Sequence, residues 1–131
     1  MPCPYFLPTR RISEATGIKA EAMPLGGTFA GECFAPGHER WQPGEQLLRS
    51  CCNSGYAEGE CDRFPSDAEA DAVRFLIQED DGRTMQIAYV LERRHYPAGQ
   101  GSIESPGTGG GLLLRTQAEA YARAYRERQS A

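Results

Sequence analysis

Five cysteines are the residues of this chain whose type and placement suggest chemistry. Cys3, Cys33, Cys51, Cys52 and Cys61 lie within the first 61 residues, and no cysteine follows. A cysteine that serves only as a small apolar side chain has no reason to avoid more than half of a protein. Thiols confined to one half are expected to meet at one place, as a metal site or a disulfide framework.

The spacing of the cysteines indicates the kind of centre. Single cysteines stand at positions 3, 33 and 61, with a pair at 51 and 52, and none forms the C-x2-C pairing of zinc ribbons and fingers. Isolated cysteines on separate segments suit a cluster several ångströms across better than one small ion. Four thiolates are the usual ligand set of a [4Fe–4S] cluster. A structural zinc ion and disulfides or unliganded thiols are the alternatives.

The adjacent pair cannot supply two ligands from a regular α-helix. The stretch from Glu45 to Ser54 is predicted to be a short helix, with Gly55 as its C-terminal cap. Consecutive side chains on such a helix point about 100° apart. We therefore expect one of Cys51 and Cys52 to face the site and the other to be spare.

Several segments carry a resemblance. They are Cys3-Pro4-Tyr5-Phe6-Leu7-Pro8, Pro24-Leu25-Gly26, Gly31-Glu32-Cys33, Cys52-Asn53-Ser54-Gly55-Tyr56-Ala57, Cys61-Asp62-Arg63-Phe64-Pro65 and Asp71-Ala72-Val73-Arg74-Phe75. In these segments, which span roughly residues 3–96, the chain resembles a family of short, uncharacterised bacterial cysteine-containing proteins with a C-N-x-G-Y-A element. The resemblance implies that Cys52, not Cys51, is the shared cysteine. It implies no established activity.

The predicted ligand set is therefore Cys3, Cys33, Cys52 and Cys61. Aromatic residues lie near these cysteines in sequence, namely Tyr5, Phe6, Phe34, Tyr56 and Phe64. They can form a dry shell that limits solvent access to a metal site, or they can be ordinary core residues. A cluster with four cysteine ligands has no open iron, which favours electron transfer or a structural role over catalysis.

Other polar residues offer weaker sites. His38 and His95 are single histidines, which are more often surface or hydrogen-bonded residues than ligands. Glu58 and Glu60 lie just before Cys61 in sequence and are expected to be solvated loop carboxylates. The chain contains no Ser–His–Asp spacing, phosphate-binding glycine motif or H-E-x-x-H.

A thiol-redox enzyme is the catalytic alternative, with Cys51 and Cys52 as nucleophile and resolving thiol. Both lie towards the C-terminal end of the predicted helix, where the helix dipole disfavours a thiolate. A zinc-stapled protein-interaction module is the other alternative to the iron–sulfur protein.

The composition indicates a small domain that needs stabilisation beyond its apolar core. The chain has 131 residues, of which 21 are Leu, Ile, Val or Phe, and it contains 15 glycines and 9 prolines. Such a loop-rich chain gains little from apolar burial against the entropy that it loses on folding. A bound metal supplies stability that the core lacks. We expect a single domain over residues 1–131.

Charge and targeting signals limit the partners. The formal net charge of −4 argues against nucleic acid as the main partner. The first residues lack a secretory signal, and no run of 18 apolar residues predicts a membrane span. We expect a cytoplasmic protein in a reducing environment, with another protein as its partner.

The elements expected to position the site form a small α+β domain. Residues 1–65 are predicted to be an irregular metal-binding half, with a weak strand near 24–33. A turn that begins at Ser66 and Asp67 and a β-hairpin, with strands at 73–78 and 84–91, fill residues 66–96. Residues 97–111 are predicted to be a mobile Gly-rich loop. The capping box from Thr116 to Glu119 predicts a C-terminal helix over 117–128, within 112–131, whose Ala118, Tyr121, Ala122 and Tyr125 face the sheet or a partner.

Overall fold

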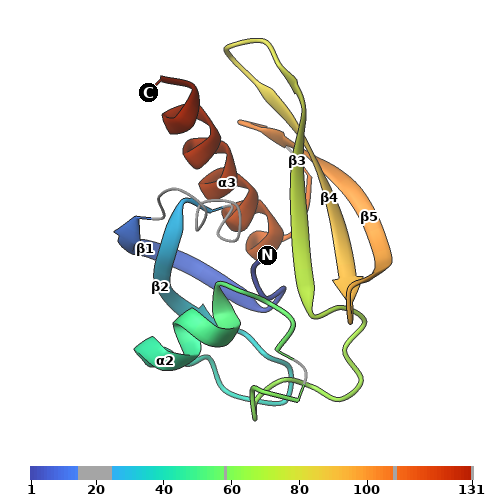
Figure 1. Cartoon of the computed structure of the whole chain (residues 1–131). Coiled ribbons are helices and arrows are strands. Elements are labelled where there is room, and N and C mark those ends of the chain that lie inside the picture. The colour runs from blue at the N-terminus through green and yellow to red at the C-terminus, as the bar shows by residue number, and fades with distance from the viewer. Residues whose placement is uncertain (15–24, 58, 108, 131) are drawn as a thin grey trace.

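The computed structural model describes residues 1–14, 25–57, 59–107 and 109–130. Its elements are β1 (Phe6–Glu14), β2 (Gly27–Cys33), α2 (Glu45–Leu47), the π-helical turn η1 (Leu48–Cys52), β3 (Ala72–Asp80), β4 (Met85–Arg93), β5 (Tyr96–Ser105) and α3 (Leu112–Ser130). The described part of the chain is a small α+β fold with two antiparallel sheets, β1-β2 and β3-β4-β5, and a C-terminal helix. Helix α3 runs between the two sheets (Figure 1).

The predicted hairpin is confirmed as β3 and β4. Its turn is held by Asp81, whose backbone N–H donates to Thr84 O at 3.2 Å and whose Oδ1 accepts the backbone N–H groups of Arg83 and Thr84 at 2.8 Å. Alternation along the strands places the predicted apolar side chains in one core. That core contains Val73, Phe75, Ile77, Met85, Ile87, Tyr89 and Leu91.

The prediction of a loop over 97–111 is wrong for most of its length, because residues 96–105 form β5. Strand β5 pairs with β4 throughout, and Ile103 at 1% exposure joins the core. Side chains of the neighbouring strand β4 cover two of the glycines that suggested a loop. Gly101 lies opposite Tyr89, whose ring covers it so closely that a Cβ would collide with the hydroxyl group. Tertiary packing thus overrides the low strand propensity of glycine.

The prediction of an irregular N-terminal half also needs correction. Residues 6–14 and 27–33 form a two-stranded sheet, of which only the second strand was anticipated. Register shifts next to Pro8 and Ile12 make β1 irregular, which explains the weak alternation in its sequence. Gly31 allows the strands to approach, since a Cβ there would collide with the carbonyl of Leu7.

Helix α3 begins five residues before its predicted start. Gly111 O accepts the first helical hydrogen bond, from Arg115 N at 2.9 Å, so Thr116 lies inside the helix and not at its cap. The Thr116 hydroxyl donates to Leu112 O at 2.7 Å, and Glu119 pairs with Arg115. The predicted face of α3 does pack on the three-stranded sheet, and the Tyr121 ring stacks on Phe75 with centroids 5.5 Å apart.

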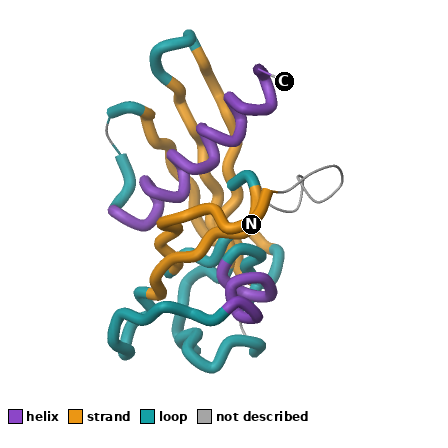
Figure 2. The backbone as a smooth tube through the Cα atoms, turned by 90° about the vertical axis from the view of Figure 1, so that its left-hand side faces the viewer, coloured by secondary structure: helices purple, strands orange, loops and turns teal. Residues whose placement is uncertain are grey.

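A second, smaller core contains Cys3, Phe6, Leu48 and Cys52. The loops and the short helical segments that build it gather at the end of the molecule opposite the β3–β4 turn (Figure 2). Gln117 of α3 joins the two cores. It is fully buried, and its Nε2 donates to the carbonyls of Cys3 at 2.8 Å and Phe6 at 2.7 Å.

Candidate metal centre

All five cysteines line one small cavity of about 20 Å³. The structure brings together the predicted ligands Cys3, Cys33, Cys52 and Cys61, and it adds Cys51. The rest of the wall is formed by Tyr5, Phe6, Ala35, Ala57, Arg63 and Phe64. All five thiols are free, without a disulfide between any two of them. Four segments that are far apart in the sequence therefore deliver sulfur atoms to one largely apolar space.

Cys3 is held by three elements. Its N–H donates to Cys52 O at 2.9 Å, its carbonyl accepts from Gln117, and the preceding Pro2 O accepts from Val73 N at 3.0 Å. These bonds tie the first residues of the chain to η1, α3 and β3. The Cys3 side chain is consequently buried, with 9% exposure of the residue.

Cys33 is positioned by the end of β2. It pairs with Phe6 across the sheet, and it forms an isolated bridge with Trp41, with Cys33 N donating to Trp41 O at 2.7 Å. Phe34 N donates to Tyr5 O at 2.8 Å, which extends the contact between the two strands. Cys33 is only half-buried, so it forms the accessible side of the cavity.

The turn that carries Cys51 and Cys52 is π-helical and not α-helical. Asn53 N donates to the carbonyl of Leu48, five residues earlier, at 3.0 Å. Both cysteines line the cavity, whereas an α-helix was expected to turn one away. The π-turn inserts an extra residue into the helical turn and so changes where its side chains point. Isolated π-turns occur frequently at functional sites.

The C-N-x-G-Y-A segment closes the turn and leads the chain back to the cavity. The Asn53 side chain bonds both the N–H and the carbonyl of Phe29, at 2.9 and 3.0 Å, and so joins η1 to β2. Gly55 has φ +72°, and a Cβ there would collide with the carbonyl of Met1. Ala57 is buried in the cavity wall, and its carbonyl accepts from Cys61 N at 2.9 Å.

The electrostatic environment keeps the buried thiols protonated in the absence of a ligand. Burial is the main cause that raises the pKa of Cys3 far above its ordinary value, and the neighbouring thiols add to it. Burial likewise raises the pKa of Cys52 to about 12, with Cys33 and Cys61 contributing. The pKa of Cys51 is also raised, chiefly by burial. A metal reverses this preference, because a coordinating thiol is deprotonated.

Arg63 is a residue of the site that sequence reasoning missed. Its guanidinium lies 4.5 Å from the Trp41 ring centroid, and its Nη2 donates to Glu39 O at 2.8 Å. Its Nε is buried and has no hydrogen-bond partner among the described residues. A buried donor without an acceptor is rare and costs about 1 to 3 kcal/mol. Arg63 thus contributes a cation to the cavity wall, and its buried Nε lacks an acceptor among the described residues.

The described residues form no site that is ready to hold a single metal ion. Among residues 1–14, 25–57, 59–107 and 109–130, no group of three or more His, Cys, Asp or Glu side chains is arranged to hold a single metal ion. The histidines do not contribute, because His38 is exposed and His95 stacks on the Tyr56 ring with centroids 3.9 Å apart. Glu60 is exposed, and Glu58 lies outside the described residues.

The aromatic residues divide between two roles. Tyr5, Phe6 and Phe64 line the cavity, and the rings of Tyr5 and Phe64 meet edge to face with centroids 5.7 Å apart. Phe34 and Tyr56 are not in its wall. The Tyr56 hydroxyl donates to the Glu92 carboxylate, which also accepts from Arg74 Nε at 2.7 Å.

Comparison with known proteins returns no relative: no protein-family model, curated protein or solved structure matches the chain. The family resemblance noted in the sequence therefore stays a prediction. Within the described residues, no helix combines the length and apolar character that a membrane crossing requires.

Proposed function

We propose that Cys3, Cys33, Cys52 and Cys61 bind one [4Fe–4S] cluster, and that the protein acts in electron transfer or as an accessory subunit stabilised by the cluster. The observation that carries the proposal is the cavity itself. Sulfur atoms from four separate segments line one apolar space, and a cation with an unsatisfied buried donor forms part of its wall.

The number of cysteines and of separate segments supports a cluster. Each iron of a four-iron cluster takes one cysteine, so its ligands surround a volume, whereas a zinc ion draws four sulfurs to about 2.3 Å from one centre. Cysteines that reach one cavity from four separate segments suit the first arrangement.

The protein residues around the cysteines have defined tasks in this proposal. Tyr5, Phe6 and Phe64 exclude water from the sulfur atoms, and Arg63 donates a hydrogen bond and positive charge. Both factors set the reduction potential of such a centre. The cluster supplies a one-electron couple. Four cysteine ligands leave no iron open for a substrate.

The burial of the thiols counts against a thiol-redox enzyme. The thiolate is the nucleophile, and burial disfavours it at Cys3, Cys51 and Cys52. A resolving pair at positions 51 and 52 would therefore react slowly at neutral pH.

A structural zinc ion is the second candidate, and the size of the cavity favours it. A volume of about 20 Å³ holds little more than one water molecule. A four-iron cluster is larger, so it fits only if the half-buried segments of Cys33 and Cys61 shift. A single ion needs the opposite change, in which the sulfurs draw together.

Spectroscopy of anaerobically purified protein separates the two candidates. The proposal predicts a brown protein with broad absorbance near about 400 nm and a reversible one-electron couple. A colourless, folded and redox-silent protein that carries zinc would overturn the cluster and leave the zinc-stapled interaction module.

A further inference from the structure

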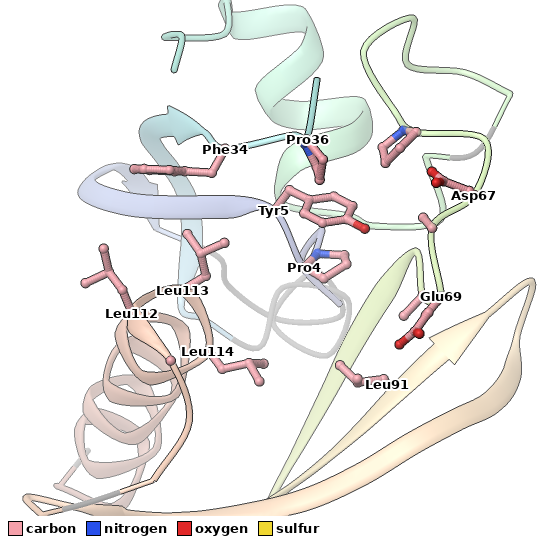
Figure 3. A pocket seen from close by; sticks show the side chains of 14 residues that line it. Pro4, Tyr5, Phe34, Pro36, Asp67, Glu69, Leu91, Leu112, Leu113 and Leu114 are labelled. Carbon is pink, nitrogen blue, oxygen red and sulfur yellow. The ribbon is translucent and has the colours of Figure 1, made fainter. Parts of the chain in front are cut away.

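A second and much larger cavity lies beside the cysteine site. Its volume is about 650 Å³, within the range of ligand and side-chain binding pockets. It lies between the first residues of the chain, the segment 65–70, the end of β4 and the first turn of α3 (Figure 3). Tyr5 lines both this pocket and the cysteine cavity, so the two spaces are neighbours.

One side of the pocket is apolar. Leu112, Leu113 and Leu114 open α3 on this side together with Phe34, and Leu91 lies across the pocket, next to Glu69 (Figure 3). Leu112 is 64% exposed. Apolar side chains that water reaches gain free energy when a partner covers them.

The opposite side is acidic. Asp67 and Glu69 line the pocket there, and the Tyr5 hydroxyl points towards that side (Figure 3). Neither carboxylate forms an ion pair with any described residue, and no Lys or Arg lines the pocket. The acidic segment is fixed in place, because Arg93 Nη1 donates to Ala68 O at 2.7 Å.

We propose that this pocket docks a segment of a partner protein that presents adjacent leucine-like side chains flanked by Lys or Arg. The apolar side chains would cover Leu112, Leu113 and Leu114, and the basic groups would pair with Asp67 and Glu69. Charge complementarity selects a basic segment, and the shared Tyr5 places the partner next to the cysteines. The docking proposal goes beyond the metal centre and does not depend on which metal is bound.

Blocked tetrapeptides serve as probes in an NMR titration of the full chain. Lys-Leu-Leu-Lys should bind in a salt-sensitive manner and shift the backbone amide resonances of residues 66–70 and 112–114. Glu-Leu-Leu-Glu tests the charge and Lys-Ser-Ser-Lys tests the apolar contact, and both should bind at least roughly fivefold more weakly.

Variants assign the binding to this pocket. Asp67→Asn with Glu69→Gln should weaken Lys-Leu-Leu-Lys roughly fivefold, and Leu112→Ser should do the same without affecting the fold. Glu79→Gln, which removes an exposed carboxylate on β3, is the matched control and should change nothing.

Three results would overturn the docking proposal. The first is that Glu-Leu-Leu-Glu binds as tightly as Lys-Leu-Leu-Lys, and the second is that no peptide binds. The third is that octylamine binds as tightly as Lys-Leu-Leu-Lys, which would assign the pocket to a small amine.

Discussion

Two adjacent cysteines share the wall of one cavity but differ in their neighbours. The carbonyl of Cys52 accepts the N–H of Cys3, and Cys52 packs in the small core with Phe6 and Leu48. The Cys51 sulfur lies 3.6 Å from the hydroxyl oxygen of Ser50 and has no such link to another predicted ligand. These contacts favour Cys52 as the ligand and leave Cys51 as a bystander.

Serine substitutions test this assignment. Cys52→Ser should abolish metal binding and lower the free energy of unfolding by several kcal/mol, because a buried ligand and its metal are lost. Cys51→Ser should retain the metal and cost about 1 kcal/mol. Metal content and urea denaturation of the two variants measure the difference. Equal loss of metal in both would reject the assignment.

Arg63 offers a test at the level of one hydrogen bond. Arg63→Gln removes a positive charge beside the centre, which disfavours the more negative reduced state. A differential interaction of about 1 to 1.5 kcal/mol corresponds to a fall in potential of roughly 40 to 60 mV. A redox titration measures the shift, and Arg83→Gln in the exposed hairpin turn is the control. An unchanged potential in Arg63→Gln would show that Arg63 does not influence the proposed cluster.

At the level of residues, the meeting of the cysteines could be predicted from their confinement to 61 positions. The role of Arg63 could not. Its signal is a buried donor without an acceptor, which exists only once Trp41 and Glu39 have fixed the guanidinium. That both Cys51 and Cys52 line the cavity was missed because nothing in the sequence indicates a π-turn.

Among the elements, the turn after η1 links the cysteine site to the strands. Gly55 N donates to Cys51 O at 2.8 Å, and Tyr56 N donates to Asp71 O at 2.8 Å. The turn therefore requires both a positive φ at Gly55 and close approach to Met1 and Ala72.

A pair of glycine substitutions separates these two requirements. Gly37 has φ +84° with open space around it, so Gly37→Ala should cost only the left-handed penalty of about 1 kcal/mol. Gly55→Ala adds a collision with backbone and should cost at least about 3 kcal/mol. Urea denaturation measures both. Similar losses would show that the close packing of this turn is unimportant.

The network of Tyr56, Arg74 and Glu92 fastens the same turn to β3 and β4. The hydrogen bond from Arg74, followed by that from Tyr56, holds the pKa of Glu92 below its ordinary value of 4.5. The unfolded chain then binds more protons near that pH, so the stabilisation is present above about pH 4.5 and is lost as the pH falls.

Glu92→Gln should reduce the loss of folding stability at acid pH. Between about pH 6 and pH 3.5, the wild-type protein should lose more stability than the variant, because only the wild type carries the lowered pKa. Urea midpoints across the range measure the two slopes. Glu79→Gln, the control, should follow the wild-type curve. If the Glu92→Gln curve runs parallel to that of the wild type, Glu92 is not the source of this pH dependence.

The predictability of the elements depended on how local their signals were. The β3–β4 hairpin was predictable because its turn residues and its alternation are adjacent in sequence. Strand β5 was not, because Gly99 and Gly101 become strand residues only under the side chains of Leu91 and Tyr89. The start of α3 was missed because the capping pattern at Thr116 is also compatible with a helix interior.

At the scale of the whole molecule, the described residues form two small cores on either side of α3. The apolar core lies between α3 and the three-stranded sheet, and the cysteine core lies between β1, η1 and the first residues. Gln117 bridges them through two carbonyls, Cys3 and Phe6. The second core has few large apolar side chains, so the metal that we propose there would add stability that apolar burial does not supply.

Removal of the metal should therefore destabilise the protein strongly. We expect Tm to fall by more than about 10 °C, because loss of the centre removes several kcal/mol of binding free energy. Calorimetry of the protein before and after chelation under reducing conditions measures the change. A Tm that is unaffected by loss of the metal would deny it a structural role.

The content of iron, acid-labile sulfide and zinc per chain tests the central proposal most directly. Anaerobically purified protein should contain about four irons and about four sulfides. One zinc per chain without sulfide, or a folded protein free of metal, would contradict it.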